Sequence, residues 1–287
     1  MSKYDVTLVT CDPLPEPDLD EGPLSNALEE AGLSVRKCVW DDPAVDWAKG
    51  RLTLIRSTWD YYRKRDAFVK WAEDVEKVSR LCNPARVVRW NSHKRYLLSL
   101  PLKGIPVVPT VMVERNSEVS LGEICANEQW SSVVIKPAVS AGSYETHAMD
   151  LGDLNEEIFA RLIDGGDVLV QPYMDSVDEY GERSLIFIDD EFSHCARKHP
   201  RFAGEDETIT GPYEPTRSEL AVADAAMDAA NAVADQPLLY GRVDLVHDED
   251  EQPLVAEIEV LEPSLFFRFS EEGLRRMVSA IGERLRS

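Results

Sequence analysis

Apolar and polar residues alternate in short runs along the first ninety positions, and this pattern predicts an open α/β lobe over residues 1–90. Helical apolar spacing is found at 24–31 and again at 67–78. Runs typical of short strands lie at 4–10, 34–40 and 51–58. Strands that alternate with helices are typical of a parallel sheet covered by helices.

Residues 91–174 are predicted to form a small β-rich lobe. One helix is expected at 92–100 and another near 155–163. The remaining apolar runs are typical of strands and lie at 107–113, 131–137, 144–150 and 167–174. The Pro-containing segment KGIPVVPT connects the first helix to this lobe.

Residues 175–287 are predicted to form a third lobe. Along the chain we expect a hairpin, a polar loop rich in Pro and Gly, an alanine-rich helix, a hairpin with an acidic turn, and a closing helix. Their positions are 183–197, 200–217, 219–234, 240–260 and 271–285.

The composition is that of a globular cytoplasmic protein. With 287 residues, 44% of them hydrophobic, the chain can bury a large core. No apolar run is long enough to span a bilayer, and the start MSKYDVTLVT lacks the features of a signal peptide. The five scattered cysteines show no CxxC spacing, which favours free thiols in a reducing cytoplasm over a structural zinc site.

The net charge limits the classes of partner. It is −22, from 53 acidic and 31 basic residues, which disfavours nucleic acid and anionic membranes. A small anionic ligand such as ATP would therefore need a site that supplies positive charge locally. The sequence leaves open whether the chain acts alone or as a homodimer.

The 240–260 segment carries the most informative polar residues. Asp244 lies on its first apolar run, and Glu257 and Glu259 lie on its second. Because strand side chains repeat every two residues, Glu257 and Glu259 are expected on one face. Neighbouring carboxylates repel each other and are costly to desolvate, so a divalent metal is one reason to keep them together. The alternative is a hairpin with a solvated acidic face, and this segment alone leaves both open.

A lysine followed by small residues indicates a second candidate site. Lys136 ends an apolar strand and precedes a loop that contains Ser140, Gly142 and Ser143. Small residues let backbone N–H groups approach phosphate oxygens, and the lysine adds positive charge. The loop lacks the GxxxxGK[ST] pattern, and an ordinary surface loop is the alternative.

The strand that ends in VLVQPYM (168–174) breaks at Pro172. Its last backbone groups, between apolar walls, could pair with the edge of an adenine, or the strand could simply connect two lobes. Cations near the acidic hairpin suggest a site for both metal and phosphate, with ordinary salt bridges as the alternative. These cations are Arg183, Arg197, Lys198 and Arg242.

Trp59 and Asp60 follow the third predicted strand. Ligands bind at the carboxyl ends of strands in parallel sheets, so both residues are candidates for a small-molecule contact. A strand end followed by a helix cap explains them equally well.

Taken in order, these elements resemble the ATP-grasp superfamily over roughly residues 90–270. The matching positions are Lys94, Lys136, the small-residue loop, the linker Gln171, Pro172, Tyr173 and Met174, and then RVD and ExE. In the D-alanine–D-alanine ligases and glutathione synthetases of that superfamily, an Asp and a Glu thirteen positions apart, with an Asn two further on, bind two magnesium ions. Asp244 and Glu257 have that spacing here, whereas Glu259 stands at the Asn position.

Within the ATP-grasp superfamily, the chain resembles one subgroup in particular. Several segments look like the group that contains the cycloserine-forming O-ureido-serine cyclo-ligase: RSTWDYYRKRDAFVKWAE, LCNPARVVRWNSHKRYLL, GERSLIFIDDEFSHCARK, GPYEPT and EIEVLEPSLFF. This similarity covers most of the chain. It indicates a subgroup and no particular substrate.

The resemblance implies an α/β ATP-grasp fold with lobes at 1–90, 91–174 and 175–287. It implies an ADP-forming ligase that joins a carboxylate to an amine on an amino-acid-like molecule, between two molecules or by closing a ring within one. An ATP-grasp phosphotransferase and a non-catalytic nucleotide sensor are the alternatives. The implied cofactors are ATP and two Mg²⁺ ions, with Mn²⁺ as the alternative metal.

The same resemblance implies residue roles. The metal would be held by Asp244, Glu257 and Glu259, and ATP by Lys94, Lys136, Lys198, the small-residue loop and the linker. Arg242 and Arg197 would stabilise the transferring phosphoryl group. The substrate site would be bordered by Trp59, Asp60, Glu182, Arg183, Ser264 and the 200–215 loop.

Overall fold

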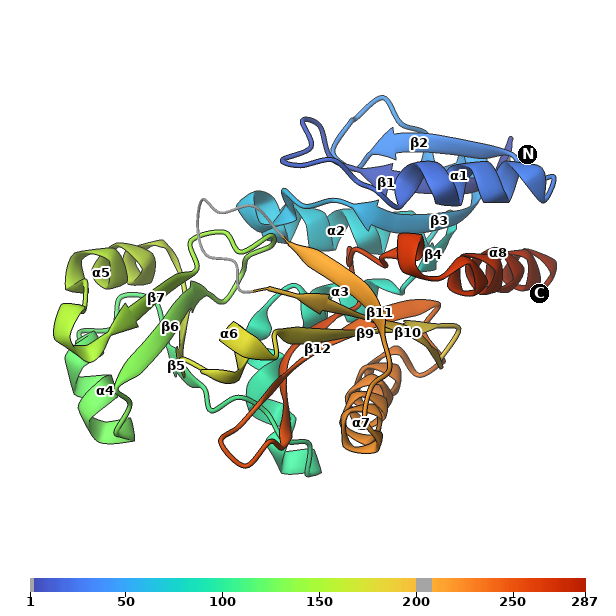
Figure 1. The fold of residues 1–287 in the computed structure, drawn as a ribbon. Helices are drawn as coiled ribbons and strands as arrows, with labels where there is room; N and C mark the ends of the chain where they lie inside the picture. The colour runs from blue at the N-terminus through green and yellow to red at the C-terminus, as the bar shows by residue number, and fades with distance from the viewer. Residues whose placement is uncertain (1–2, 200–207) are drawn as a thin grey trace.

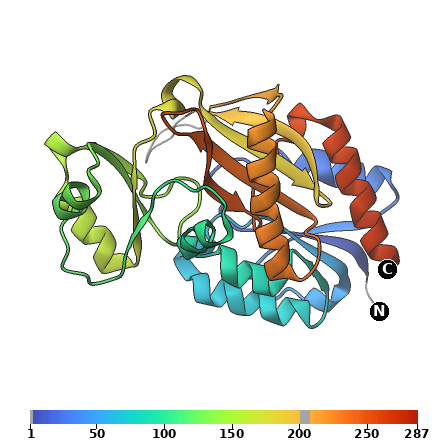
Figure 2. The ribbon, with the colours of Figure 1, turned by 90° about the horizontal axis from the view of Figure 1, so that it is seen from below.

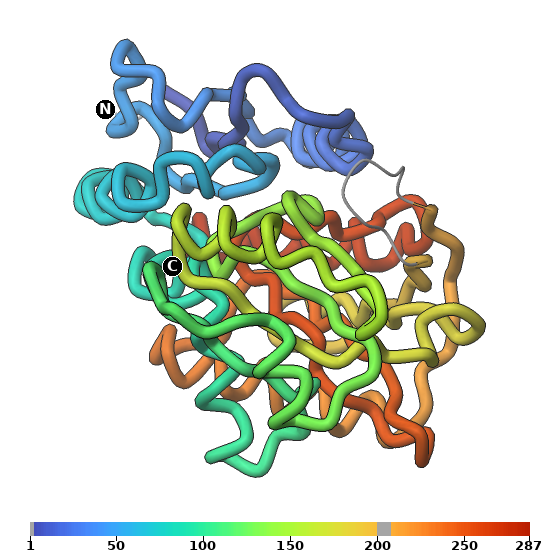
Figure 3. Tube along the Cα trace, turned by 90° about the vertical axis from the view of Figure 1, so that its left-hand side faces the viewer, coloured from blue at the N-terminus to red at the C-terminus, as the bar shows by residue number. Residues whose placement is uncertain are grey.

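The computed structural model describes residues 3–199 and 208–287. Within these ranges the strands form three sheets, one in each of three lobes (Figure 1). Seen from the side in Figure 3, the green central lobe faces the viewer and the blue N-terminal lobe lies above it. No helix in the described part of the chain has the length and apolar character needed to cross a membrane.

The N-terminal lobe is an open parallel sheet with strand order β2-β1-β3-β4, which confirms the α/β prediction. Its strands are β1 Tyr4–Thr10, β2 Val35–Val39, β3 Gly50–Ser57 and β4 Arg80–Cys82. Its helices are α1 Glu21–Glu30, α2 Arg65–Glu76 and α3 Ala85–Asn91. The pattern did not predict β4 or α3, because three and seven residues are too few to display a period.

The central lobe is an antiparallel sheet with strand order β5-β8-β6-β7. Its strands are β5 Val111–Val113, β6 Ser132–Pro137, β7 His147–Asp150 and β8 Val168–Pro172. Two helices, α4 Leu121–Glu128 and α5 Glu156–Gly165, cover one face of this sheet and share an apolar core with it (Figures 1 and 2). Lys136, near the end of β6, is thereby positioned at the edge of a rigid layer.

The C-terminal lobe is an antiparallel sheet with strand order β11-β10-β9-β12-β13. Its strands are β9 Glu182–Ile188, β10 Glu191–Lys198, β11 Ile209–Tyr213, β12 Tyr240–His247 and β13 Pro253–Glu259. Its helices are α6 Ser176–Glu179, α7 Arg217–Ala234 and α8 Glu271–Arg286.

The prediction of a polar loop over 200–217 was wrong in part. Residues 200–207 lie outside the described residues, but Ile209–Tyr213 form β11, which pairs with β10 at the edge of the sheet. Pro212 suggested a loop, yet proline is compatible with an edge strand because one row of backbone groups there needs no partner.

Alternate residues of β9 face two different layers, because strand side chains point to opposite sides. Leu185 and Phe187 pack with α7, whereas Ile186 and Ile188 pack with α8 and the N-terminal lobe. In Figure 1 the C-terminal helix α8 lies beneath the N-terminal lobe, and both chain ends lie on the same side of the molecule. The apolar core therefore continues from the first lobe into the last.

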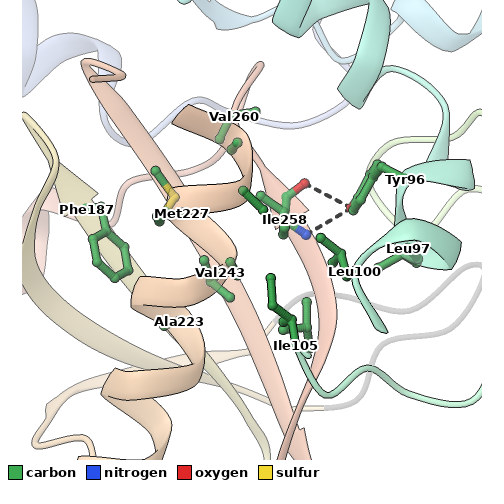
Figure 4. Close-up of a cluster of buried hydrophobic side chains, with 14 of the residues drawn as sticks. Tyr96, Leu97, Leu100, Ile105, Phe187, Ala223, Met227, Val243, Ile258 and Val260 are labelled. Atoms are coloured by element: carbon green, nitrogen blue, oxygen red, sulfur yellow. Dashed lines mark hydrogen bonds between the residues drawn. The ribbon is translucent and has the colours of Figure 1, made fainter. Parts of the chain in front are cut away.

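The predicted helix at 92–100 is a 3₁₀ helix over Lys94–Ser99, and Tyr96 attaches it to β13. The Tyr96 hydroxyl accepts a hydrogen bond from the Ile258 amide at 2.9 Å and donates to the Ile258 carbonyl at 3.0 Å (Figure 4). Leu97 and Leu100 pack in the same buried cluster. This attachment sets the position of Lys94 relative to the neighbouring Glu257.

Candidate active site

A cavity of about 750 Å³ opens where the three lobes meet. Trp59 and Tyr62 come from the first lobe, Lys136 from the second, and Arg242 and Glu257 from the third. Its volume lies within the range of roughly 300–1,000 Å³ that small-molecule sites occupy.

One wall of the cavity is formed by the acidic hairpin. Arg242 pairs with Glu259 across β12 and β13, and Asp244 pairs with Glu257. A register shift after Asp244 leaves Ala256 without an opposite residue. Glu257 and Glu259 both line the cavity, which confirms that the two side chains share a face.

Asp244 lies beneath this wall and is only 1% exposed. Arg242 donates two hydrogen bonds to its carboxylate at 2.9 Å, and Lys198 and Ser184 each donate one at 2.7 Å. Burial alone would raise the pKa of Asp244, but Arg242 and Lys198 outweigh it and hold that pKa well below its usual range. Asp244 is therefore a buried anion fully paired with protein cations.

Glu257 lies between two lysines that come from separate elements, the 3₁₀ helix Lys94–Ser99 and β6. Lys94 forms an ion pair with its Oε1, and the Lys136 nitrogen lies 4.0 Å from its Oε2. Burial opposes the charge of Glu257, but both lysines lower its pKa. Burial also lowers the pKa of Lys136, and the like charges of Lys94 and Lys198 add to that effect. The negative charge near Lys136 thus does not offset the effect of its burial. A phosphate group bound beside this lysine would add negative charge there.

Glu259 lacks sufficient positive charge. Burial raises its pKa to about 7, and the negative charges of Asp244 and Glu257 contribute, despite the ion pair with Arg242. A divalent cation held by oxygen ligands would relieve this repulsion, so the three carboxylates fit Mg²⁺ in chemical type. In this structure, however, Lys and Arg supply the counter-charge. Within residues 3–199 and 208–287, no three His, Cys, Asp or Glu side chains form a ready metal cage.

The small-residue loop after β6 bends sharply and contacts the first lobe. Gly142 and Ser143 have φ values of 58° and 57°, in the left-handed region. The Ser140 carbonyl accepts hydrogen bonds from Lys94 at 3.2 Å and from the Tyr61 hydroxyl at 3.3 Å. The ring of Tyr144 packs against that of Tyr62 at an angle of 31°, with centroids 4.5 Å apart. The loop is thus held over the cavity from outside its own lobe.

The linker after β8 forms an apolar part of the wall. Buried Gln171 donates to the Thr110 hydroxyl at 2.8 Å, and the Tyr173 amide donates to the Ser132 carbonyl at 3.0 Å. Pro172 and Met174 line the cavity together with other apolar side chains: Val108, Val134, Val177 and Val246. A flat, largely apolar group such as a purine suits this part of the cavity.

The chain that follows β13 has no regular structure up to Phe267, and buried Asp20 holds its far end. The Asp20 carboxylate accepts three backbone N–H groups, at 2.6, 3.0 and 2.9 Å. These belong to Leu265, Phe266 and Phe267. A carboxylate bound to three amides acts here as a clamp from the first lobe.

The near end of this segment is also held by side chains. Trp59 donates to the Glu262 carbonyl at 2.9 Å, and Arg56 donates to the Pro263 carbonyl at 3.1 Å. Arg242 donates to the Ser264 carbonyl at 3.1 Å. The side chains of Glu262 and Ser264 both line the cavity. The N-terminal lobe therefore sets the position of this part of the site.

Most residues proposed from the sequence meet at this cavity. Those that line it are Trp59, Lys94, Lys136, Ser140, Gly142, Ser143, Gln171, Pro172, Tyr173, Met174, Glu182, Lys198, Arg242, Glu257, Glu259 and Ser264.

Four proposed residues do not line it. Asp244 is covered by Arg242 and Lys198, as described above, and Asp60 accepts a hydrogen bond from the Trp40 indole at 2.8 Å. The remaining two are arginines of the neighbouring strands β9 and β10, Arg183 and Arg197.

The geometry does not support roles for these two arginines at the cavity. The Arg183 guanidinium lies between the rings of Tyr180 and Tyr213, 4.1 and 4.5 Å from their centroids. The Arg197 guanidinium donates to the Glu179 carbonyl. Because neighbours on a strand point to opposite faces, Lys198 faces the cavity and Arg197 faces away.

Sequence reasoning missed Glu262, which lines the cavity three residues after Glu259. Its spacing in EIEVLEP does not follow strand alternation, so the alternation that groups Glu257 with Glu259 does not include it. Tyr62, Tyr144 and Glu16 also line the cavity and were not singled out. A third acidic residue close to an ExE pair was the available signal.

We expect Glu262 to contribute a fall in the stability of the ligand-free protein as pH rises from about 5 to 8. Burial, with the nearby charge of Glu259, raises its pKa from 4.5 to about 8. Between these values the folded state binds more protons than the unfolded chain, so the free energy of unfolding declines, by at most about 1.4 kcal/mol per pH unit. Urea unfolding in EDTA at several pH values measures the slope.

Glu262→Gln should make that slope shallower, with Glu259 accounting for part of what remains. An unchanged slope in the variant would show that Glu262 does not titrate in this window.

The chain was compared with known proteins. A family model described as the N-terminal domain of D-cycloserine synthetase DcsG matches residues 6–83. The cycloserine biosynthesis protein DcsG of Streptomyces lavendulae is 35% identical over 284 residues, which cover 94% of this chain and 95% of that protein. The crystal structure of D-cycloserine synthetase DcsG has a TM-score of 0.88 and 34% identity, and covers 98% of this chain and 99% of that one.

More distant structures share the fold. The D-alanine–D-alanine ligase from Bacillus anthracis complexed with ATP has a TM-score of 0.71 at 12% identity, with 99% of both chains covered. The ATP-grasp ligase PsnB, complexed with a phosphomimetic precursor variant, Mg and ADP, has a TM-score of 0.68 at 15% identity. That match covers 99% of this chain and 100% of PsnB. At such identities the likeness concerns the fold alone.

Proposed function

The chain belongs to the ATP-grasp ligases, in the family of the cycloserine biosynthesis protein DcsG, and from this premise we propose a specific reaction for it. The protein uses ATP and Mg²⁺ to join a carboxylate to an amine through an acyl phosphate, and it forms ADP. Its substrate is an amino-acid-like small molecule, and the new bond can close a ring within that molecule. One relative is named D-cycloserine synthetase, and this name supports a small cyclic product.

The observation that carries the proposal is the convergence of cations from separate segments on one acidic hairpin. Lys94, Lys136, Lys198 and Arg242 all line the cavity beside Glu257 and Glu259. On a protein of net charge −22, this cluster supplies the local positive charge that a triphosphate requires. The small-residue loop and the apolar linker offer places for the phosphates and the base.

Asp244, Glu257 and Glu259 would hold the magnesium ions. When bound, Mg²⁺ neutralises charge on the β- and γ-phosphates and orients them for in-line transfer. Lys94 and Lys198 are paired with Glu257 and Asp244 in this structure, and their ammonium groups would be available to phosphate oxygens if magnesium took their place. This exchange keeps the buried carboxylates neutralised at each stage.

In the first step, a carboxylate oxygen of the substrate attacks the γ-phosphorus of ATP. The bond from that phosphorus to the bridging oxygen breaks, and ADP leaves. Lys136 and Arg242 both line the cavity and would bind the charge that gathers on the transferring group. The chemistry needs positioning more than covalent help from the protein.

In the second step, a nitrogen of the substrate attacks the acyl carbon. The bond from carbon to the phosphate oxygen breaks, phosphate leaves, and the nitrogen loses one proton. Arg242, held by Asp244 and by the Ser264 carbonyl, stabilises the negative oxygen of the tetrahedral intermediate. Glu182 or a bound phosphate oxygen can accept the proton.

Hydroxylamine tests the proposal. We expect a hydroxamate and one ADP when the protein, Mg·ATP and a substrate are incubated with it, because hydroxylamine intercepts an acyl phosphate. The substrates to screen are amino acids and their ureido, hydroxylamine and dipeptide derivatives, beginning with O-ureido-D-serine. ADP release by coupled assay and mass spectrometry of the products provide the measurement.

Two outcomes would contradict the proposal. A stable phosphorylated product without hydroxamate would indicate a phosphotransferase. Binding of ATP with no turnover across the panel would indicate a nucleotide sensor.

A further inference from the structure

Among the described residues Glu262 has no ion-pair partner, unlike the carboxylates of the acidic hairpin and Glu182. Asp244, Glu257 and Glu259 each have a Lys or Arg nitrogen within 4.0 Å. Glu182 is paired with Lys198. Among the described residues, no Lys, Arg or His nitrogen lies within 4.0 Å of the Glu262 carboxylate.

The backbone of Glu262 is fixed at the point where its side chain leaves for the cavity. Its carbonyl accepts the Trp59 indole N–H at 2.9 Å, and the next carbonyl, of Pro263, accepts Arg56 at 3.1 Å. Arg56 is itself only 2% exposed. The backbone that carries Glu262 is thus held in place beside the cavity that this residue lines.

A carboxylate that is ionised here without an ion pair costs free energy. Burial raises the pKa of Glu262 to about 8, and Glu259 and Glu257 contribute. Removing a charged group from water without a partner is unfavourable, and a cation supplied by a ligand would recover that cost. The charge of Lys94 lowers this pKa only in part, so the described chain leaves Glu262 without an ion pair of its own.

We propose that Glu262 binds the ammonium group of the substrate, so that the enzyme selects carboxylates that carry a free amine and rejects plain carboxylic acids. This inference rests on the proposed ligase function and names the substrate class for it. Trp59 lines the same wall and is bonded to the Glu262 backbone, so its ring is available to the same cation.

Binding without turnover provides the test. O-ureido-D-serine and its counterpart lacking the α-amino group are titrated by calorimetry into protein saturated with Mg·AMPPNP. We expect the wild-type protein to bind the amino compound roughly 10- to 100-fold more tightly, the value of a hydrogen-bonded charge pair. In Glu262→Gln this preference should disappear, while the affinity for the des-amino compound stays the same.

Two controls separate the substrate role from others. Glu249→Gln makes the same change of charge on the exposed turn between β12 and β13 and should keep the preference. The affinity of Glu262→Gln for Mg·AMPPNP should equal that of the wild type. A weaker affinity there would assign Glu262 to metal or nucleotide binding and overturn the inference.

The inference is also overturned if the wild-type protein binds both compounds equally, or binds neither. These outcomes are distinct from failure of the proposed function. Preference for the amino compound without hydroxamate formation would contradict the ligase reaction alone. Hydroxamate formation without preference would contradict the role of Glu262 alone.

Discussion

Glu257→Gln is expected to reduce ADP formation by about a thousandfold or more while the fold survives. Glu257 joins Lys94 and Lys136 and is one of the three carboxylates proposed to hold magnesium. Loss of one preorganised electrostatic group in an active site costs roughly 10²–10³ in rate, and a group that also positions two lysines should lie at the upper end. Glutamine keeps the size and one acceptor for Lys94, so the side chain still fills its place.

Two measurements check this expectation. Steady-state ADP release with the best substrate of the panel gives the loss of activity, and circular dichroism with thermal unfolding shows whether the fold is intact. Glu249→Gln, on the exposed turn, has the same change of charge and should keep full activity. Full activity in Glu257→Gln would exclude it as a metal ligand.

Arg242→Ala is expected to lower both stability and activity. The Arg242 side chain bonds Asp244, Glu259 and the Ser264 carbonyl, and it is only 5% exposed. Its removal leaves buried carboxylates with too little positive charge, which typically costs about 3–5 kcal/mol of unfolding free energy. ADP formation should fall by roughly 10³-fold, because the transferring phosphoryl group loses a nearby cation. Urea unfolding and ADP release measure the two effects.

Arg242→Lys separates charge from geometry. Lysine keeps the positive charge but cannot make two parallel hydrogen bonds to Asp244. We expect it to recover part of the stability and little of the activity. If Arg242→Ala unfolds at the wild-type urea concentration, then Arg242 does not neutralise the buried carboxylates in the way that the contacts indicate.

The local elements of the fold were predictable because apolar periodicity is a property of neighbouring residues. The strands β1, β3 and β12 and the helices α7 and α8 follow their patterns closely. The strand β11 was missed, since its alternation is weak and Pro212 suggested a loop. Its pairing with β10 depends on a neighbour that is distant in sequence rather than on its own composition.

Prediction of the site was uneven for a related reason. Lys198 and Arg197 are adjacent on β10, and alternation says only that they face opposite ways. Which of the two faces the cavity depends on how the sheet packs, and the structure assigns that position to Lys198. Glu262 was missed because it follows the end of a strand, where no period applies.

The sequence by itself determined that Asp244, Glu257 and Glu259 share one hairpin, because alternation and spacing act over a few residues. It also indicated the superfamily, through the order of its lysines and carboxylates. Only the tertiary structure decided that Lys94 pairs with Glu257 across 163 positions, and that Trp59 holds Glu262 across 203. Contacts of that range depend on how buried faces of separate elements pack together. No local pattern encodes this packing, which is why the place of Glu262 at the cavity was found only in the folded chain.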